Sequence, residues 1–311
     1  MKDLEEYIAL RRALGAKLER TDEFLRSFIT FLEERGAPYV TTPLAVEWAT
    51  RPSRASKVHH ARRLTQVRLF ATFLKAKDRR HEVPPAGMIQ AKPCRARPYL
   101  YSAEEVRSIV DVARSLPPAR GVRGMGIRGE TCSTIIGLLA VTGMRVSEAL
   151  RLDRGDVDLE GGVLTVRWTK FNKTRLLPLH PSASKALRTY ARRRDAIVTR
   201  ALCDAFFLCD RGTRVTGVMI RHAFRQVSRK IGIRGLNASR GPRIHDLRHR
   251  FAVEALLAWY RQGIDAAKRL PVLATYLGHV HITDTHWYLE AVPELLELAA
   301  CRVQQRSRRD S

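Results

Sequence analysis

Residues 245–249 read His-Asp-Leu-Arg-His, residues 277–279 read Leu-Gly-His, and Tyr288 follows nine residues after His279. An imidazole, a guanidinium, a second imidazole and a phenol therefore succeed one another along this part of the chain. Arginine and histidine side chains can bind a phosphodiester through charge-assisted hydrogen bonds, and a phenol oxygen can attack its phosphorus. The segment predicts a site for phosphodiester chemistry, which would need further positive charge from elsewhere in the sequence.

One source of that charge is Arg145, in the sequence Thr-Gly-Met-Arg-Val-Ser-Glu at residues 142–148. A strongly apolar helix is predicted over 131–142, with Gly143 ending it, and helix resumes over 146–150. A charge at the end of a buried helix is costly unless it is paired. Glu148 is a plausible partner that would orient the guanidinium. A purely structural Arg–Glu pair is the alternative interpretation.

A second source is the segment Thr-Lys-Phe-Asn-Lys at residues 169–173. Residues 163–168 and 175–179 predict two short strands, so Lys170 and Lys173 fall at the tip of a hairpin. A lysine in a hairpin turn is usually only a solvated charge. Here it could also donate a proton to a leaving oxygen.

The charge of the whole chain points in the same direction. Its 311 residues include 56 Lys+Arg against 31 Asp+Glu, a net charge of +25. Such an excess predicts binding to nucleic acid, with an anionic membrane surface or a merely solvated basic surface as alternatives. The sequence contains no apolar run long enough to span a bilayer, and its first residues are unlike a signal peptide. Five scattered cysteines fit reduced thiols, so we expect a cytoplasmic, nucleoid-associated protein without a membrane partner.

The length predicts about two domains. Helical spacing of apolar residues predicts a helical domain over 1–80, and prolines and arginines predict a linker over 81–98. The remaining residues, 99–311, would form the second domain. The predicted fold class is mostly α with a small β-sheet.

Several elements within these domains carry local signals. We expect Thr21 and Ser56 to begin helices of the first domain and Ser102, with Glu105 in a capping box, to begin the first helix of the second. Residues 206–208 predict a short buried strand. Further helices are expected over 182–194, 216–231, from 245 onward, 273–277 and 290–303.

The helix that begins near Ser56 has a basic face. Duplex contact is predicted for Lys57, Arg62, Arg63 and Arg68, although a solvated face is equally compatible with the pattern. Lys173, in the hairpin, is a further predicted DNA-binding residue.

Cofactor sites are not predicted. His245 and His249 would share a helical face, but aspartate rather than glutamate follows the first histidine, unlike a zinc protease. Histidines 279, 281 and 286 have no Cys or Glu spaced to complete a metal site. Residues 124–129 match G-x-G-x-x-G, but Pro117 and Pro118 occupy the place of the required strand, so a loop is expected. We therefore expect no metal and no nucleotide cofactor.

Taken together, the motifs at 142–148, 170–179, 245–249, 277–279 and Tyr288 resemble those of the tyrosine recombinases of the phage integrase family, in the bacterial integrase and Xer-like branch. The resemblance covers nearly the whole chain. It implies that Arg145 and Arg248 hold the scissile phosphate, that His279 binds a non-bridging oxygen, and that Tyr288 is the nucleophile.

The resemblance also implies the proton-transfer groups. Lys170 would be the general acid, and His245 would assist proton transfer at the nucleophile. The family commonly has Gly where this chain has Phe171. Because this difference puts the conformation of the turn in doubt, Lys173 is the alternative acid.

At larger scale, the resemblance implies a helical core-binding domain and a mixed α/β catalytic domain that form a C-shaped clamp on double-stranded DNA. It implies inverted-repeat core sites, a monomer without DNA and a homo-tetramer on two duplexes. Cleavage would pass through a covalent 3′-phosphotyrosyl intermediate, in the integration, excision or transposition of a mobile element. A DNA-binding regulator without catalysis, and a type IB topoisomerase or hairpin-telomere enzyme, are the alternatives.

Overall fold

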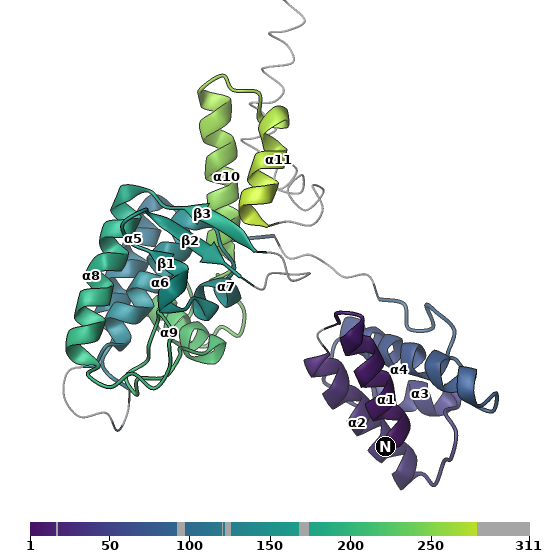
Figure 1. Ribbon diagram of the computed structural model, residues 1–311. Helices are drawn as coiled ribbons and strands as arrows, with labels where there is room; N and C mark the ends of the chain where they lie inside the picture. The colour runs from purple at the N-terminus through teal and green to yellow at the C-terminus, as the bar shows by residue number, and fades with distance from the viewer. Residues whose placement is uncertain (17, 92–96, 120, 122–125, 168–173, 279–311) are drawn as a thin grey trace, which may run out of the picture. The chain divides into compact units, whose positions relative to one another are not determined.

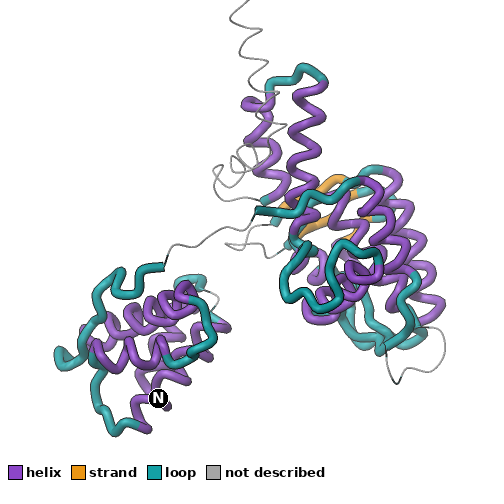
Figure 2. Tube along the Cα trace, turned by 180° about the vertical axis from the view of Figure 1, so that it is seen from behind, coloured by secondary structure: helices purple, strands orange, loops and turns teal. Residues whose placement is uncertain are grey.

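The computed structural model describes residues 1–16, 18–91, 97–119, 121, 126–167 and 174–278. The chain divides into two compact units, Met1–Ala96 and Arg97–Ser311. Each unit has its own hydrophobic core. Helices make up most of both units, and Figure 2 shows that the strands form one small patch within the second.

The first unit contains α1 (Lys2–Ala13), α2 (Glu19–Glu34), α3 (Thr42–Thr50) and α4 (Lys57–Lys77). Aromatic side chains dominate its core: the ring of Phe28 lies edge-on to Trp48 at 5.2 Å between centroids, and Tyr7 contacts Phe70 at 5.2 Å. The four helices lie against one another in the unit labelled N in Figure 1. Apolar stripes at helical spacing therefore build a helical core, as the sequence predicts.

Local capping explains most of the boundaries in this unit. The Ser56 hydroxyl accepts a hydrogen bond from the His59 amide and begins α4, as expected. Gly36 follows Arg35, the C-cap residue of α2, and has a φ of +60°, a conformation in which glycine is favoured over any side chain. The prediction that Thr21 begins the second helix is wrong, because that helix already starts at Glu19.

Residues just beyond α4 pack on the first unit. The Val40 amide donates to His81 Nδ1 at 3.0 Å, and the Glu82 amide donates to Val40 O at 2.8 Å. Val83 and Ile89 pack against the same core. The early part of the segment expected to be an extended linker, 81–91, is thus held against the helices.

The second unit runs through α5 (Ala103–Arg114), α6 (Arg128–Thr142), α7 (Val146–Arg151), the 3-10 helix η1 (Arg154–Asp156), β1 (Val157–Asp158), β2 (Val163–Val166), β3 (Arg175–Pro178), α8 (Pro181–Ile197), α9 (Gly217–Lys230), α10 (Asp246–Arg261) and α11 (Ala266–Leu277). The sheet is antiparallel in the order β1-β2-β3, with Val163 opposite Pro178 and Val166 opposite Arg175. In Figure 1 the sheet lies beside α6 and α7, and α10 and α11 form a pair at one end.

The apolar helix α6 lies at the centre of this unit. Ile135, Ile136 and Leu139 are all at most 2% exposed. Gly143 ends the helix with a φ of +60°, and a Cβ atom there would lie 2.5 Å from the ring of Phe251 on α10. Only glycine satisfies both the backbone conformation and this close approach, which fixes α10 against the end of α6.

Three features of the second unit differ from the sequence-based expectation. Phe206, Phe207 and Leu208 are buried as predicted, but they form no strand, and of the three only Leu208 makes an isolated bridge, with Arg214. α11 begins seven residues earlier than predicted, at Ala266 rather than residue 273. β1 was not foreseen, because two residues are too few to show an alternating pattern.

Within the described residues, no helix combines the length and the apolar composition needed to cross a bilayer.

Candidate functional site

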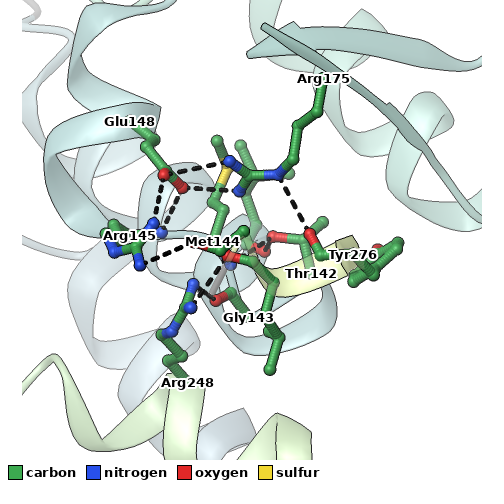
Figure 3. A network of polar contacts seen from close by, with 11 residues as sticks. Thr142, Gly143, Met144, Arg145, Glu148, Arg175, Arg248 and Tyr276 are labelled. Atoms are coloured by element: carbon green, nitrogen blue, oxygen red, sulfur yellow. Dashed lines mark hydrogen bonds and ion pairs between the residues drawn. The ribbon is translucent and has the colours of Figure 1, made fainter. Parts of the chain in front are cut away.

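The C-terminal end of α11 accepts hydrogen bonds from three arginines that come from three other elements (Figure 3). Arg175 Nε on β3 donates to Tyr276 O at 3.0 Å, Arg248 Nη2 on α10 to Leu277 O at 2.9 Å, and Arg145 Nη2 to Gly278 O at 2.9 Å. The last carbonyls of a helix lack intrahelical partners and carry its partial negative charge. Guanidinium groups therefore satisfy and neutralise this helix end.

Arg145 occupies the N-cap position of α7, at the corner that follows α6. Its amide donates to Glu148 Oε2 at 2.9 Å, and its Nη1 donates to Glu148 Oε1 at 2.9 Å. The side chain is 30% exposed. The pairing with Glu148 expected from the sequence is present, and solvent still reaches the guanidinium.

Arg248 lies in the first turn of α10 and is only 3% exposed. Besides Leu277 O, it donates from Nη1 to Gly143 O at 2.8 Å. One guanidinium thus joins the end of α6, the start of α10 and the end of α11. The structure brings Arg145 and Arg248, 103 positions apart in sequence, to consecutive carbonyls of one helix end.

Glu148 is buried, at 5% exposed, and also receives a second guanidinium. Arg175 donates from Nη1 to Oε1 at 3.1 Å and from Nη2 to Oε2 at 2.8 Å. Burial alone would raise the pKa of the Glu148 carboxyl, but hydrogen bonds and charge from Arg175, and then from Arg145, lower it overall. Glu148 is consequently a carboxylate at neutral pH. Arg175 was not foreseen from the sequence.

His245 directly precedes α10, as expected, and is an exposed residue. Surrounding protein atoms still displace much of its water, and this desolvation, with the nearby Arg248 charge, lowers the pKa of His245 below its usual 6.5. The His249 ring lies edge-on at 5.1 Å, and burial lowers its pKa to about 4. Both imidazoles are therefore neutral at pH 7, and His245 can accept a proton.

An open cleft of about 530 Å³ adjoins Arg145 and His245. Its other charged lining residues are Arg151, Arg214 and Arg221. Cationic side chains gathered around a cleft favour an anionic ligand such as a phosphate group.

Other predicted site residues lie outside the described residues: Lys170, Lys173, His279 and Tyr288. Their neighbours in sequence do reach the cluster. Gly278 immediately precedes His279, and Arg175 follows the segment that contains both lysines.

The predicted duplex-binding face of α4 needs one correction. Lys57 and Arg62 are exposed and Arg68 is half-buried, whereas Arg63 is 8% exposed. The Arg63 guanidinium lies 3.6 Å from the centroid of the Trp48 ring and donates to Trp48 O at 2.9 Å. Its cation–π contact and hydrogen bond commit Arg63 to the core of the first unit rather than to a ligand.

Where the structure describes the chain, no three side chains of the His, Cys, Asp or Glu type are grouped closely enough to hold a metal ion.

The fold and the arginine cluster define a recognisable class of protein. Residues 102–294 match the sequence model described as the phage integrase family. The chain belongs to the phage integrase family, the tyrosine recombinases.

Individual relatives fall within the same class. The chain is 44% identical over 304 residues to a Sinorhizobium fredii protein named integrase/recombinase y4rB, covering 97% of this chain and 96% of the relative. It is 30% identical to the tyrosine recombinase XerD of Rhizobium meliloti, covering 90% and 84% of the two chains. Among solved structures, the Tn1549 transposon integrase in complex with transposon right end DNA superposes with a TM-score of 0.65 at 16% identity, covering 97% and 98%. The last similarity concerns the fold alone.

Proposed function

We propose that this protein is a site-specific DNA recombinase that cleaves and rejoins DNA through a covalent 3′-phosphotyrosyl intermediate. The convergence of Arg145 and Arg248 on one helix end, beside a neutral His245 and an arginine-lined cleft, is the observation that supports it most strongly. Membership of the phage integrase family supports the same reaction.

In the proposed reaction the Tyr288 oxygen attacks the scissile phosphorus. The bond from phosphorus to the 5′ oxygen breaks as the bond to tyrosine forms, and the phosphoryl group stays on the enzyme. Lys170, or Lys173 in its place, protonates the departing 5′ oxygen, while His245 accepts the tyrosine proton. Rejoining reverses these steps when a 5′ hydroxyl of the exchanged strand attacks the phosphotyrosine.

The two arginines and His279 would bind the non-bridging oxygens, where negative charge develops in the transition state. Preorganised donors in such positions contribute about 3 kcal/mol each. The bonds of Arg145 to Glu148 and Gly278 O, and those of Arg248 to Gly143 O and Leu277 O, support this role, because they fix both guanidiniums before DNA binds. The lowered pKa of His245 keeps its ring neutral and able to act as a base.

The proposed substrate is double-stranded DNA with inverted-repeat core sites. The first unit, with Lys57, Arg62 and Arg68 on α4, would bind duplex as a core-binding domain, and the second unit would bind it as the catalytic domain. Four protomers would act on two duplexes, and the protein would be a monomer without DNA. The 44% identical relative named as an integrase/recombinase supports a role in DNA integration, for which a mobile element is the proposed substrate. We place this activity in the cytoplasm, at the nucleoid.

The test is covalent trapping on a nicked suicide duplex built from inverted repeats that flank the gene. The wild type should become covalently linked to DNA. Arg145→Ala and Arg248→Ala should each lose about 100-fold or more in cleavage rate while still binding the duplex. Arg188→Ala, an exposed arginine whose partner is Leu159 O, is the matched control and should cleave normally. A wild type that binds this duplex and never becomes linked to it would contradict the proposal.

A further inference from the structure

Arg175 takes part in the arginine cluster without any role assigned to it. It lies on β3 and is 13% exposed. Its five N–H donors form a planar fork, and three of its nitrogens are used within the protein: Nη1 and Nη2 on Glu148, and Nε on Tyr276 O. These contacts join the sheet, α7 and the end of α11 through one side chain (Figure 3).

We propose that Arg175 is a positioning residue for DNA cleavage, which holds Glu148 away from full pairing with Arg145 and fixes the end of α11 that leads into His279. This inference rests on the proposed function. Arg175 acts entirely through its protein partners and not through contact with DNA.

Arg175 affects the balance of charge around Glu148. Glu148 is buried, and both Arg145 and Arg175 donate to it, so its negative charge is shared between two cations. Without Arg175, the buried carboxylate would depend on Arg145 for compensation, since an uncompensated buried charge is costly. The Arg145 guanidinium would then be drawn toward Glu148 and away from the cleft, where the phosphate is proposed to bind.

Arg175 also packs against the C-terminal end of α11. Gly278 has a φ of +69°, and a Cβ atom there would lie 2.7 Å from Arg175 Nη1. The absence of a side chain at Gly278 thus allows Arg175 to pack against the backbone that immediately precedes His279. Its bond to Tyr276 O fixes the same turn. Loss of Arg175 would release the turn that determines where the following segment begins.

A lysine cannot replace this residue. Its single ammonium group cannot bind both carboxylate oxygens in parallel while also reaching Tyr276 O, as the planar fork does. Misplacing a reacting group by about 1 Å can cost ~100-fold in rate. We therefore expect Arg175→Lys and Arg175→Ala to lower the cleavage rate at saturating DNA by about 10- to 100-fold, with duplex Kd unchanged.

The control is Arg167→Ala on the full-length chain. Arg167 immediately follows β2 in the same sheet region and pairs with Asp156, which is as well buried as Glu148, but it makes none of the contacts above. It should cleave at the wild-type rate. A double variant, Arg175→Ala with Glu148→Gln, should lose less than the product of the two single-variant losses, because both changes remove the interaction between Arg175 and Glu148. Normal cleavage by Arg175→Lys, or multiplied losses in the double variant, would overturn the proposal.

A second readout is independent of activity. Amide hydrogen exchange in the last turn of α11 and the residue after it, residues 274–278, should be faster in both Arg175 variants than in the wild type and in Arg167→Ala. Unchanged exchange there would overturn the inference even if cleavage is lost. If the wild type fails to cleave while exchange responds as expected, the positioning role of Arg175 on α11 stands and the proposed reaction is the part that fails.

Discussion

Arg63 illustrates how an arginine in an amphipathic helix can be misread. Its position on α4 groups it with the basic residues beside it, yet its guanidinium lies over the ring of Trp48 in the core. Helical spacing indicates the face from which a side chain leaves the helix, and it carries no information about where the end of a long side chain comes to lie. The position of the Arg63 guanidinium is set by its tertiary partner, Trp48, which lies on α3.

Arg62 and Arg63 therefore make a matched pair. Arg62→Ala should weaken binding to duplexes of any sequence and reduce the slope of log Kd against log salt by about one, because one phosphate contact is lost. Arg63→Ala should instead lower the free energy of unfolding by about 2 kcal/mol, through the lost hydrogen bond and ring contact. Urea denaturation and fluorescence anisotropy separate the two effects. Equal salt slopes and equal stabilities for both variants would refute this division.

Lys170 is predicted to protonate the leaving 5′ oxygen. A thiol, with a pKa near ~8.5, leaves without a proton, whereas an alcohol oxygen does not. Replacing the bridging 5′ oxygen by sulfur should thus restore much of the cleavage that Lys170→Ala loses. It should do little for Arg145→Ala, whose defect concerns the non-bridging oxygens.

The same substrate discriminates between the two lysines. Rescue of Lys173→Ala but not of Lys170→Ala would place the acid three residues further along the chain. If sulfur rescues neither variant, the hairpin does not supply the proton.

At the scale of elements, short-range signals predicted the fold well. Ser102 with Glu105 forms the expected capping box, and Thr216 caps α9 through its hydroxyl. These interactions lie within three residues of each other, so the local sequence contains all of the necessary information. The same holds for Gly143 at the end of α6.

Contacts between residues far apart in the sequence could not be predicted from local signals. The partners of Arg175 lie 27 and 101 residues away, at Glu148 and Tyr276. No local pattern indicates that a strand arginine will meet a helix end from another part of the chain. The sequence indicated Arg145, His245 and Arg248 as site residues through their motifs, and the structure adds the framework that brings these three together.

The close packing of Gly143 against Phe251 can be tested by substitution. Gly143→Ala should lower the free energy of unfolding by about 2–4 kcal/mol, since a left-handed backbone conformation and contact with Phe251 both oppose a Cβ atom. Gly263→Ala is the control: its φ is +72°, but nothing lies within 4 Å of the added atom, so only about 1–2 kcal/mol should be lost. Urea denaturation measures both. A Gly143 variant no less stable than the Gly263 variant would contradict the close packing of α6 against α10.

For the whole molecule, a net charge of +25 should dominate duplex binding. Because each neutralised phosphate releases counterions, affinity for a duplex of arbitrary sequence should fall steeply with salt, by about 0.9 log units per log unit for each contact. Anisotropy titrations between low and moderate salt measure this slope. Binding that does not change with salt would remove the reason for interpreting the basic surface as a DNA-binding surface.

Peptide mapping of the trapped complex can show whether Tyr288 is the residue that becomes covalently joined to DNA. Wild-type protein linked to a nicked suicide duplex should yield, after digestion of protein and DNA, one modified peptide with the nucleotide on Tyr288. Tyr288→Phe should bind the same duplex with equal affinity and give no linked species. A nucleotide found on another residue, or a covalent complex formed by Tyr288→Phe, would contradict this role of Tyr288.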